Sequence, residues 1–168
     1  MVRLRPFKKL DIDQMLSWME DERQTAVWAS GVFSWPLNRE EILARLIQAQ
    51  EAEDEWALAC LDEQGELIGQ LYMRMVHYKE NRVHLNMIVM DPTRRGQGLG
   101  TEMVKKTVEY AFSILGMQKV TLGVFDCNPG AHICYQKAGF QDTFIEEHAY
   151  EYQGEIWNRQ HMAIERKV

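Results

Sequence analysis

The 168-residue sequence is poor in cysteine, in long apolar runs and in positive charge, and each shortage excludes a class of protein. Its three cysteines, Cys60, Cys127 and Cys134, form no Cys-x-x-Cys pair or zinc-spaced cluster, which argues against a disulfide framework and a metal site. No apolar stretch reaches about 18 residues, and no apolar run follows the basic N-terminus, so we predict neither a membrane span nor a signal peptide. We therefore expect a cytoplasmic protein with reduced thiols, no metal and no membrane partner.

Positive charge is the third shortage. There are 19 basic residues against 25 acidic ones, which gives a formal net charge of −6. Proteins that hold a phosphate backbone by bulk charge are strongly basic, so nucleic acid is excluded as the main partner. The same acidity favours encounter with a cationic ligand, such as an amine or a basic peptide end.

The chain has the length of roughly one domain, because domains average about 150 residues. With 46% hydrophobic and 10% aromatic residues it can bury a core, which excludes disorder over any long segment. It contains no internal repeat, low-complexity segment or linker. We predict a single domain spanning residues 1–168.

Hydrophobic periodicity predicts an α+β fold. The predicted order is one strand, two helices, three strands that form an antiparallel meander, a helix, a strand, a helix and two strands. Helices are expected at 10–19, 38–52, 101–115 and 129–137, and strands after the first at 56–61, 67–76, 83–90, 119–125, 140–150 and 155–165. The sum is a mixed, mostly antiparallel sheet of about seven strands with about four helices.

An aromatic-rich loop is predicted between the first two helices, at residues 28–36. It contains Trp28, Phe33 and Trp35. Large aromatic side chains usually anchor a loop over the core, and this is the first interpretation. The second is that the loop forms one wall of a substrate pocket.

A glycine-rich turn at residues 91–101 (DPTRRGQGLGT) joins a predicted strand to the clearest predicted helix. Free N–H groups and the helix dipole stabilise an anion at a helix N-terminus, and glycines let it approach the backbone closely. A P-loop would need Lys-Ser/Thr after Gly100, and a dinucleotide fingerprint would need glycine where Thr101 stands. Both motifs fail, whereas residues 95–100 fit Arg/Gln-x-x-Gly-x-Gly/Ala, and Arg94 and Arg95 add positive charge.

A second motif follows about 28 residues later. Residues 128–140 (NPGAHICYQKAGF) match Asn-x-x-Ala-x-x-x-Tyr-x-x-x-Gly-Phe. With both motifs in this order, residues 83–140 resemble the GNAT family of acetyl-CoA-dependent N-acetyltransferases, and the rest of the chain is similar in its order of strands and helices. Gln153-Gly154 resembles a hairpin common in the branch that acetylates ribosomal-protein N-termini and polyamines.

The resemblance implies that the fourth and fifth strands are parallel and splayed, with the pantetheine arm of acetyl-CoA between them. It also implies that the arm's amides pair with the free edge of the fourth strand and that the pyrophosphate binds backbone N–H groups of the glycine-rich turn. The positions that match the family's cofactor contacts are Ile88, Val89, Met90, Arg95, Gly96, Gln97, Gly98, Gly100, Thr101 and Asn128.

The implied reaction is direct attack of a primary amine on acetyl-CoA through a tetrahedral intermediate. The acceptor would be a protein N-terminus, a polyamine or another small amine. Tyr135 stands at the family's general-acid position, and a phenol of pKa about 10 stays protonated at neutral pH and can donate to the leaving thiolate. The other interpretation of Tyr135 is a tyrosine that only faces the core.

The base is left open. Several N-terminal acetyltransferases have a glutamate five residues before the Asn of the second motif, but Gly123 stands there in this chain. The candidates are His84, Asn86, Asp126, Glu20, Asp21 and Glu22. We expect His148 and His161 at surface or hairpin positions.

A different class of function is a non-catalytic acyl-CoA sensor or interaction module with the same fold. A third is transfer to a hydroxyl, or transfer of a longer acyl group. The protein is expected to be a monomer or a homodimer. We also hypothesise that the acidic excess lies on the acceptor side of the site, where it would attract a cationic amine.

Overall fold

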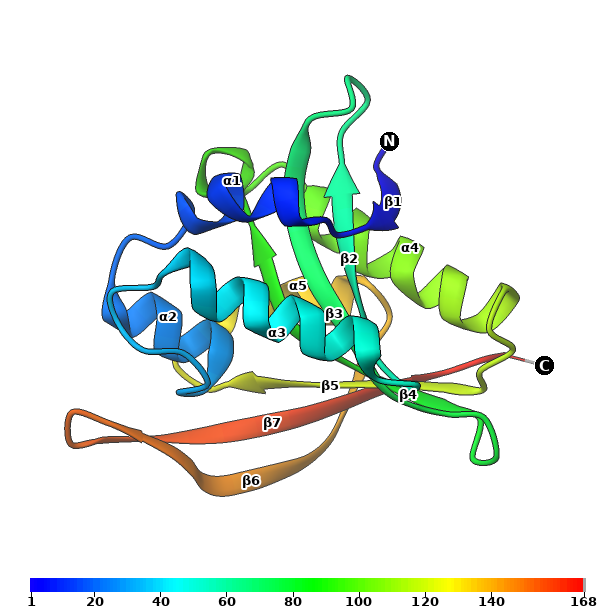
Figure 1. Ribbon diagram of the computed structural model, residues 1–168. Helices are drawn as coiled ribbons and strands as arrows, with labels where there is room; N and C mark the ends of the chain where they lie inside the picture. Colours follow the sequence, from blue (N-terminus) through cyan, green and yellow to red (C-terminus); the bar gives the residue numbers. More distant parts are fainter. Residues whose placement is uncertain (168) are drawn as a thin grey trace.

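The computed structural model describes residues 1–167 and contains one seven-stranded sheet with five α-helices (Figure 1). The strands are β1 (Arg3–Pro6), β2 (Trp56–Leu61), β3 (Leu67–His77), β4 (Arg82–Met90), β5 (Lys119–Phe125), β6 (Gln141–Tyr152) and β7 (Glu155–Glu165). The α-helices are α1 (Ile12–Leu16), α2 (Glu22–Ala29), α3 (Arg39–Glu51), α4 (Leu99–Ser113) and α5 (Pro129–Lys137), with 3-10 turns η1 (Lys9–Asp11) and η2 (Pro92–Arg94). None of these helices is long and apolar enough to cross a membrane.

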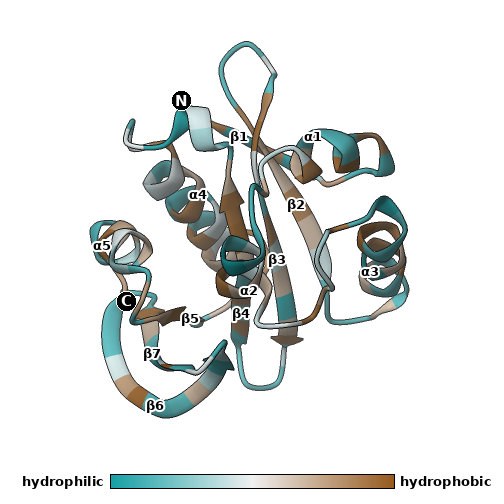
Figure 2. Ribbon diagram, turned by 90° about the vertical axis from the view of Figure 1, so that its left-hand side faces the viewer, coloured by the Kyte–Doolittle hydropathy of each residue, from teal (hydrophilic) through white to brown (hydrophobic). Residues whose placement is uncertain are grey.

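The strand order is β1-β2-β3-β4-β5-β7-β6, and every neighbouring pair is antiparallel except β4 and β5. Helices cover both faces: Figures 1 and 2 show α4 and α5 on one side of the sheet and α1 and α3 on the other. One core lies under α4 and α5 and includes Leu85, Val104 and Leu122. A second core, which includes Ile42 and Tyr72, lies under α1 and α3.

The predicted α+β fold with a mixed, mostly antiparallel sheet of seven strands is confirmed. Helix α5 begins and ends as predicted, because Asn128 accepts a hydrogen bond from the Ala131 N–H and Pro129 stands at the first helical position. The prediction for α3 also holds, since Asn38 caps it by accepting from the Glu41 N–H.

The structure has five α-helices where about four were predicted, and the difference lies in the N-terminal segment. The predicted helix at 10–19 is the turn η1 followed by the short α1, and α2 lies mostly between that predicted helix and the loop predicted at 28–36. Asp21 caps α2 by accepting from the Gln24 N–H at 2.7 Å. The predicted aromatic loop therefore begins inside α2, because Trp28 belongs to its last turn.

Strands β4 and β5 pair only along their first halves. Their register runs from Arg82 opposite Lys119 to Leu85 opposite Leu122 and then stops. Just beyond this point Met87 has a φ of +48°, and the pairing of β4 with β3 shifts by one residue. Such a bulge bends a strand and increases its twist. The two parallel strands separate as the resemblance implied, and they leave the edge of β4 free from Asn86 onward.

Candidate active site

A cavity of about 1020 Å³ opens where β4 and β5 separate. Its walls come from β4 and β5, from the first turns of α4, from α5 and α2, and from residues of β3 and β7. Both sequence motifs therefore meet at a single cavity, although they are separate in the chain.

The glycine-rich turn forms one end of this cavity. Gly96 and Gly98 have φ values of +75° and +79°, in the left-handed region that only glycine occupies without strain. Gly98 is the N-cap of α4, and its carbonyl accepts from the Glu102 N–H at 3.0 Å. The N–H groups between Gly98 and Glu102 precede the first intrahelical bonds and can bind an anion.

Both arginines of the turn were expected to add positive charge, but Arg94 is already paired with a carboxylate. Arg94 forms an ion pair with Asp62 at 2.8 Å, and this pairing holds the pKa of the Asp62 carboxyl below its usual range. The Arg95 amide already donates to the Pro92 carbonyl at 3.4 Å, so the guanidinium of Arg95 is its available group.

Nearly all of the residues predicted to hold the cofactor line this cavity. They are Ile88, Val89, Met90, Arg95, Gly96, Gly98, Gly100, Thr101 and Asn128. Gln97 is the exception; its amide lies 3.5 Å from the Thr93 carbonyl. Among residues 1–167, no group of three or more His, Cys, Asp or Glu side chains is arranged to hold a metal ion.

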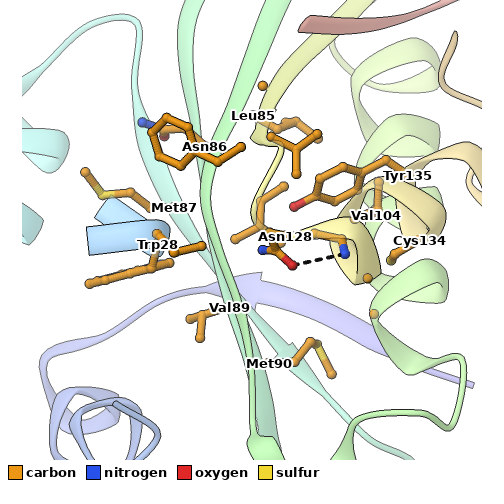
Figure 3. A pocket seen from close by; sticks show the side chains of 18 of the residues that line it. Trp28, Leu85, Asn86, Met87, Val89, Met90, Val104, Asn128, Cys134 and Tyr135 are labelled. Carbon is orange, nitrogen blue, oxygen red and sulfur yellow. Dashed lines mark hydrogen bonds between the residues drawn. The ribbon is translucent and has the colours of Figure 1, made fainter. Parts of the chain in front are cut away.

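Tyr135 lies on α5 with its side chain between the core and the cavity. In Figure 3 it extends from α5 toward β4, on the same side of that strand as Val104 and Asn128, whereas Trp28, Asn86 and Met87 lie on the other side. Only 7% of the residue is exposed, and burial raises the pKa of its phenol. The hydroxyl therefore stays protonated at neutral pH. It makes no hydrogen bond with another of the described residues and remains able to donate.

At the position where several N-terminal acetyltransferases have a glutamate, this chain has Gly123, and a side chain from a neighbouring strand occupies the space. A Cβ on Gly123 would lie 2.7 Å from Cδ of Arg159, so the arginine of β7 fills the space that a side chain at 123 would need. His161 lies directly opposite Gly123 in the register of β5 with β7. Its Nε2 is 2.8 Å from Oε2 of Glu146, and its ring stacks on Phe144 at 4.2 Å between centroids.

His161 lies on β7 of the β6–β7 hairpin, opposite Phe144, which agrees with the predicted hairpin position, but it is half-buried and lines the cavity. His148 is exposed, as predicted. No motif pointed to His161, because its neighbours come from strands that are distant in the sequence.

The other base candidates have different surroundings. His84 lines the cavity with its Nδ1 at 2.8 Å from Oγ1 of Thr121, and burial lowers the pKa of its imidazole to about 4. Asn86 lines the cavity, but an amide is no base at neutral pH. Asp126 is exposed and accepts from the Asn158 amide, and it does not line the cavity.

Of the acidic cluster, Glu20 and Asp21 line the cavity, and the Asp21 carboxylate is engaged as the cap of α2. Glu22 instead accepts from the side chain of Gln153 at 3.2 Å. Trp28 lines the cavity and stacks on Phe33, which favours the pocket-wall interpretation for this one residue of the loop.

The buried neutral imidazole of His84 makes the protein sensitive to acid. Its pKa is about 4 in the fold against 6.5 in an unfolded chain, so the unfolded state binds the proton more readily between these values. We expect the free energy of unfolding to fall as the pH is lowered from about 6.5 toward about 4. In His84→Asn this fall should be smaller, measured as urea midpoints across the range. An unchanged pH slope would contradict the prediction.

The family model for the Acetyltransferase (GNAT) family matches residues 12–140. A thialysine N-epsilon-acetyltransferase from Bos taurus is 33% identical over 89 residues, which is 52% of this chain and 52% of that protein. A spermidine N(1)-acetyltransferase from Vibrio cholerae is 29% identical over 88 residues, 51% of this chain and 50% of that protein. The chain thus spans about half the length of these two relatives.

Some solved structures cover nearly the whole chain. The spermidine N-acetyltransferase from Vibrio cholerae in complex with CoA and spermine superimposes with a TM-score of 0.84, covers 98% of this chain and 95% of its own, and is 20% identical. At that identity the likeness establishes a shared fold.

Proposed function

The chain belongs to the GNAT family of acetyltransferases, and from this we propose that it is an N-acetyltransferase that moves the acetyl group of acetyl-CoA to a primary amine. The observation that carries the proposal is one cavity bordered by the glycine-rich N-terminus of α4, the free edge of β4 and the protonated hydroxyl of Tyr135. The relatives support an amine acceptor, since both names specify acetylation on a nitrogen. We propose residues 1–168 as a single domain, because the sheet contains strands from both ends of the chain.

The residues present fit acetyl-CoA. Phosphate oxygens would accept from the N–H groups at the start of α4, with Arg95 adjacent, and the pantetheine amides would pair with the unpaired edge of β4 at Ile88–Met90. The Asn128 side chain uses its oxygen to cap α5, which leaves its amide N–H₂ to donate. Acetyl-CoA supplies an activated acetyl group when bound.

Two proton transfers are assigned to residues of this chain. Tyr135 holds a proton at its hydroxyl and donates it to the leaving sulfur. For the amine we propose His161 as the base. If its Nε2–H donates to Glu146, its Nδ1 carries a free lone pair, and stacking on Phe144 holds the ring in place. His84 is the weaker base, because an imidazole of pKa about 4 has little affinity for a proton.

Replacement of His161 by Gln tests the base. The amide keeps a polar side chain but accepts no proton, so we expect the turnover number to fall by about 10²-fold. His77→Gln is the matched control, because His77 lies in the β3–β4 hairpin outside the cavity. Equal turnover in His161→Gln and His77→Gln would remove His161 from the mechanism.

The enzymatic proposal is tested by release of coenzyme A thiol from acetyl-CoA over a panel of amines and peptide N-termini. We expect release that depends on both acetyl-CoA and an amine. Binding of acetyl-CoA with no release for any amine would instead indicate a non-catalytic acyl-CoA-binding module.

A further inference from the structure

Arg74 on β3 lines the cavity and has no counter-ion among residues 1–167. Its Nε is buried and has no hydrogen-bond partner in that part of the chain. A buried donor without an acceptor is destabilising, and nearly all such groups in native proteins are satisfied. Arg74 therefore has the properties of a group whose acceptor is a ligand.

The strand register shows where Arg74 lies. It is directly opposite His84, which is opposite Thr121 on β5. Two and four residues further along β5 are Gly123 and Phe125, opposite His161 and Arg159 of β7. Because opposed residues share a face of the sheet and alternate residues along a strand return to it, all of these residues lie on one face.

This face is the floor of the cavity near His84 and His161, and it is basic. Arg159 lines it and is neutralised by Glu146, with the two groups 3.1 Å apart. Arg74 has no such partner in the described part of the chain, and its charge is close enough to His84 to contribute to the low pKa of that imidazole. An ammonium group over this floor would meet a positive charge. The hypothesis that acidic residues attract the acceptor therefore draws no support from this floor.

Arg74 lies on β3 too far from the glycine-rich turn to serve the cofactor phosphates. It faces His84, whereas the glycine-rich turn follows Met90, six residues later along the strand. At about 3.3 Å per residue this is a separation of about 20 Å. The missing partner therefore belongs to the acceptor side of the cavity.

We infer that the acceptor carries a carboxylate in addition to its reacting amine, and that Arg74 binds this carboxylate. The inference rests on the proposed N-acetyltransferase activity and names its substrate class, a small amino acid with a free amine. A guanidinium presents paired N–H donors that match the two oxygens of a carboxylate.

A second unsatisfied atom in the same cavity agrees with this class. Oδ1 of Asn86 is buried with no hydrogen-bond partner in residues 1–167, and Asn86 stands two residues from His84 on β4. This amide oxygen accepts hydrogen bonds, whereas the guanidinium of Arg74 donates them. A molecule with both an amine N–H and a carboxylate satisfies both groups, whereas a polyamine offers nothing to Arg74.

Matched pairs of amines that differ by one carboxylate test the inference: lysine against cadaverine, ornithine against putrescine, and 2,4-diaminobutyrate against 1,3-diaminopropane. For at least one pair we expect the amino acid to have a kcat/KM at least about tenfold above its decarboxylated partner, which corresponds to about 1.4 kcal/mol. If every diamine is acetylated as well as its amino acid or better, the inference is wrong.

Substitutions of Arg74 then distinguish a role in binding the carboxylate of the acceptor from a purely structural role. Arg74→Gln should remove the preference by lowering kcat/KM for the amino acid at least about tenfold, with the diamine and acetyl-CoA affinity changed less than about twofold. Arg74→Lys should keep part of the preference, and Arg3→Gln, on the distant β1, should keep all of it. An equal loss for both members of a pair would assign Arg74 a structural role. Absence of thiol release with every amine would overturn the proposed activity itself, and this inference with it.

Discussion

Replacement of Tyr135 by Phe is expected to lower the turnover number by about 10²-fold while changing the affinity for acetyl-CoA less than about twofold. The substitution removes one oxygen from a buried side chain and leaves its ring against Phe140 at 6.4 Å between centroids. Without this acid the leaving thiolate takes its proton from water. Steady-state kinetics and a separate acetyl-CoA binding measurement distinguish the two effects.

Tyr110→Phe is the matched control for this variant. Tyr110 packs against the same core from α4, outside the cavity, so its substitution removes the same oxygen from a position without a proposed role. We expect wild-type turnover. If Tyr135→Phe also turned over like the wild type, Tyr135 would be the core-facing tyrosine of the alternative interpretation.

The second large effect is expected at Gly98. Replacement by Val places a β-branched residue at a φ of +79°, a conformation that costs an L-residue about 1–2 kcal/mol. The chain relieves this strain by shifting the first turn of α4, which displaces the N–H groups proposed to bind phosphate. We expect the KM for acetyl-CoA to rise at least about tenfold, equivalent to about 1.4 kcal/mol.

Gly65→Val controls for the strain itself. Gly65 has a φ of +88° in the turn between β2 and β3, and a Cβ at either glycine would meet no atom within 4 Å. Both variants should therefore lose similar stability, measured as the urea midpoint, and only Gly98→Val should lose cofactor affinity. The same KM in both variants would show that the α4 turn does not bind the cofactor.

Segments with strong local signals could be predicted from the sequence. Strands β2, β5 and β7 have the predicted ends because their apolar runs are bounded by turn residues. Helix α2 could not be predicted in this way, because its buried residues are Thr25, Ala26 and Ala29, which are too small to form a clear apolar stripe.

Residues of the site could likewise be predicted only where they belong to a continuous motif. The glycine-rich turn and the Tyr135 helix are continuous segments, and their spacing predicted that they would act together. Arg74 lies on β3, whereas Arg159 and His161 lie on β7, and only the register between strands brings them together. The sequence carries no distinct signal for that register.

The absence of a side chain at Gly123 determines how the residues around it pack. Without a Cβ it leaves room for Arg159 across the strand pair, and Arg159 shares Glu146 with His161. A glutamate at position 123 would collide with this arrangement. The base therefore moves from β5 to β7 in our account, and the net charge of −6 gives no guide to the local charge of the acceptor floor.

Mass spectrometry of the products is the most direct test of the central claim. Purified protein is incubated with acetyl-CoA and the amine panel, and the acetylated amine and coenzyme A are quantified together. We predict an N-acetylated product formed in equal amount to coenzyme A. Coenzyme A formed without any acetylated amine, or no coenzyme A at all, would contradict the assignment as an N-acetyltransferase.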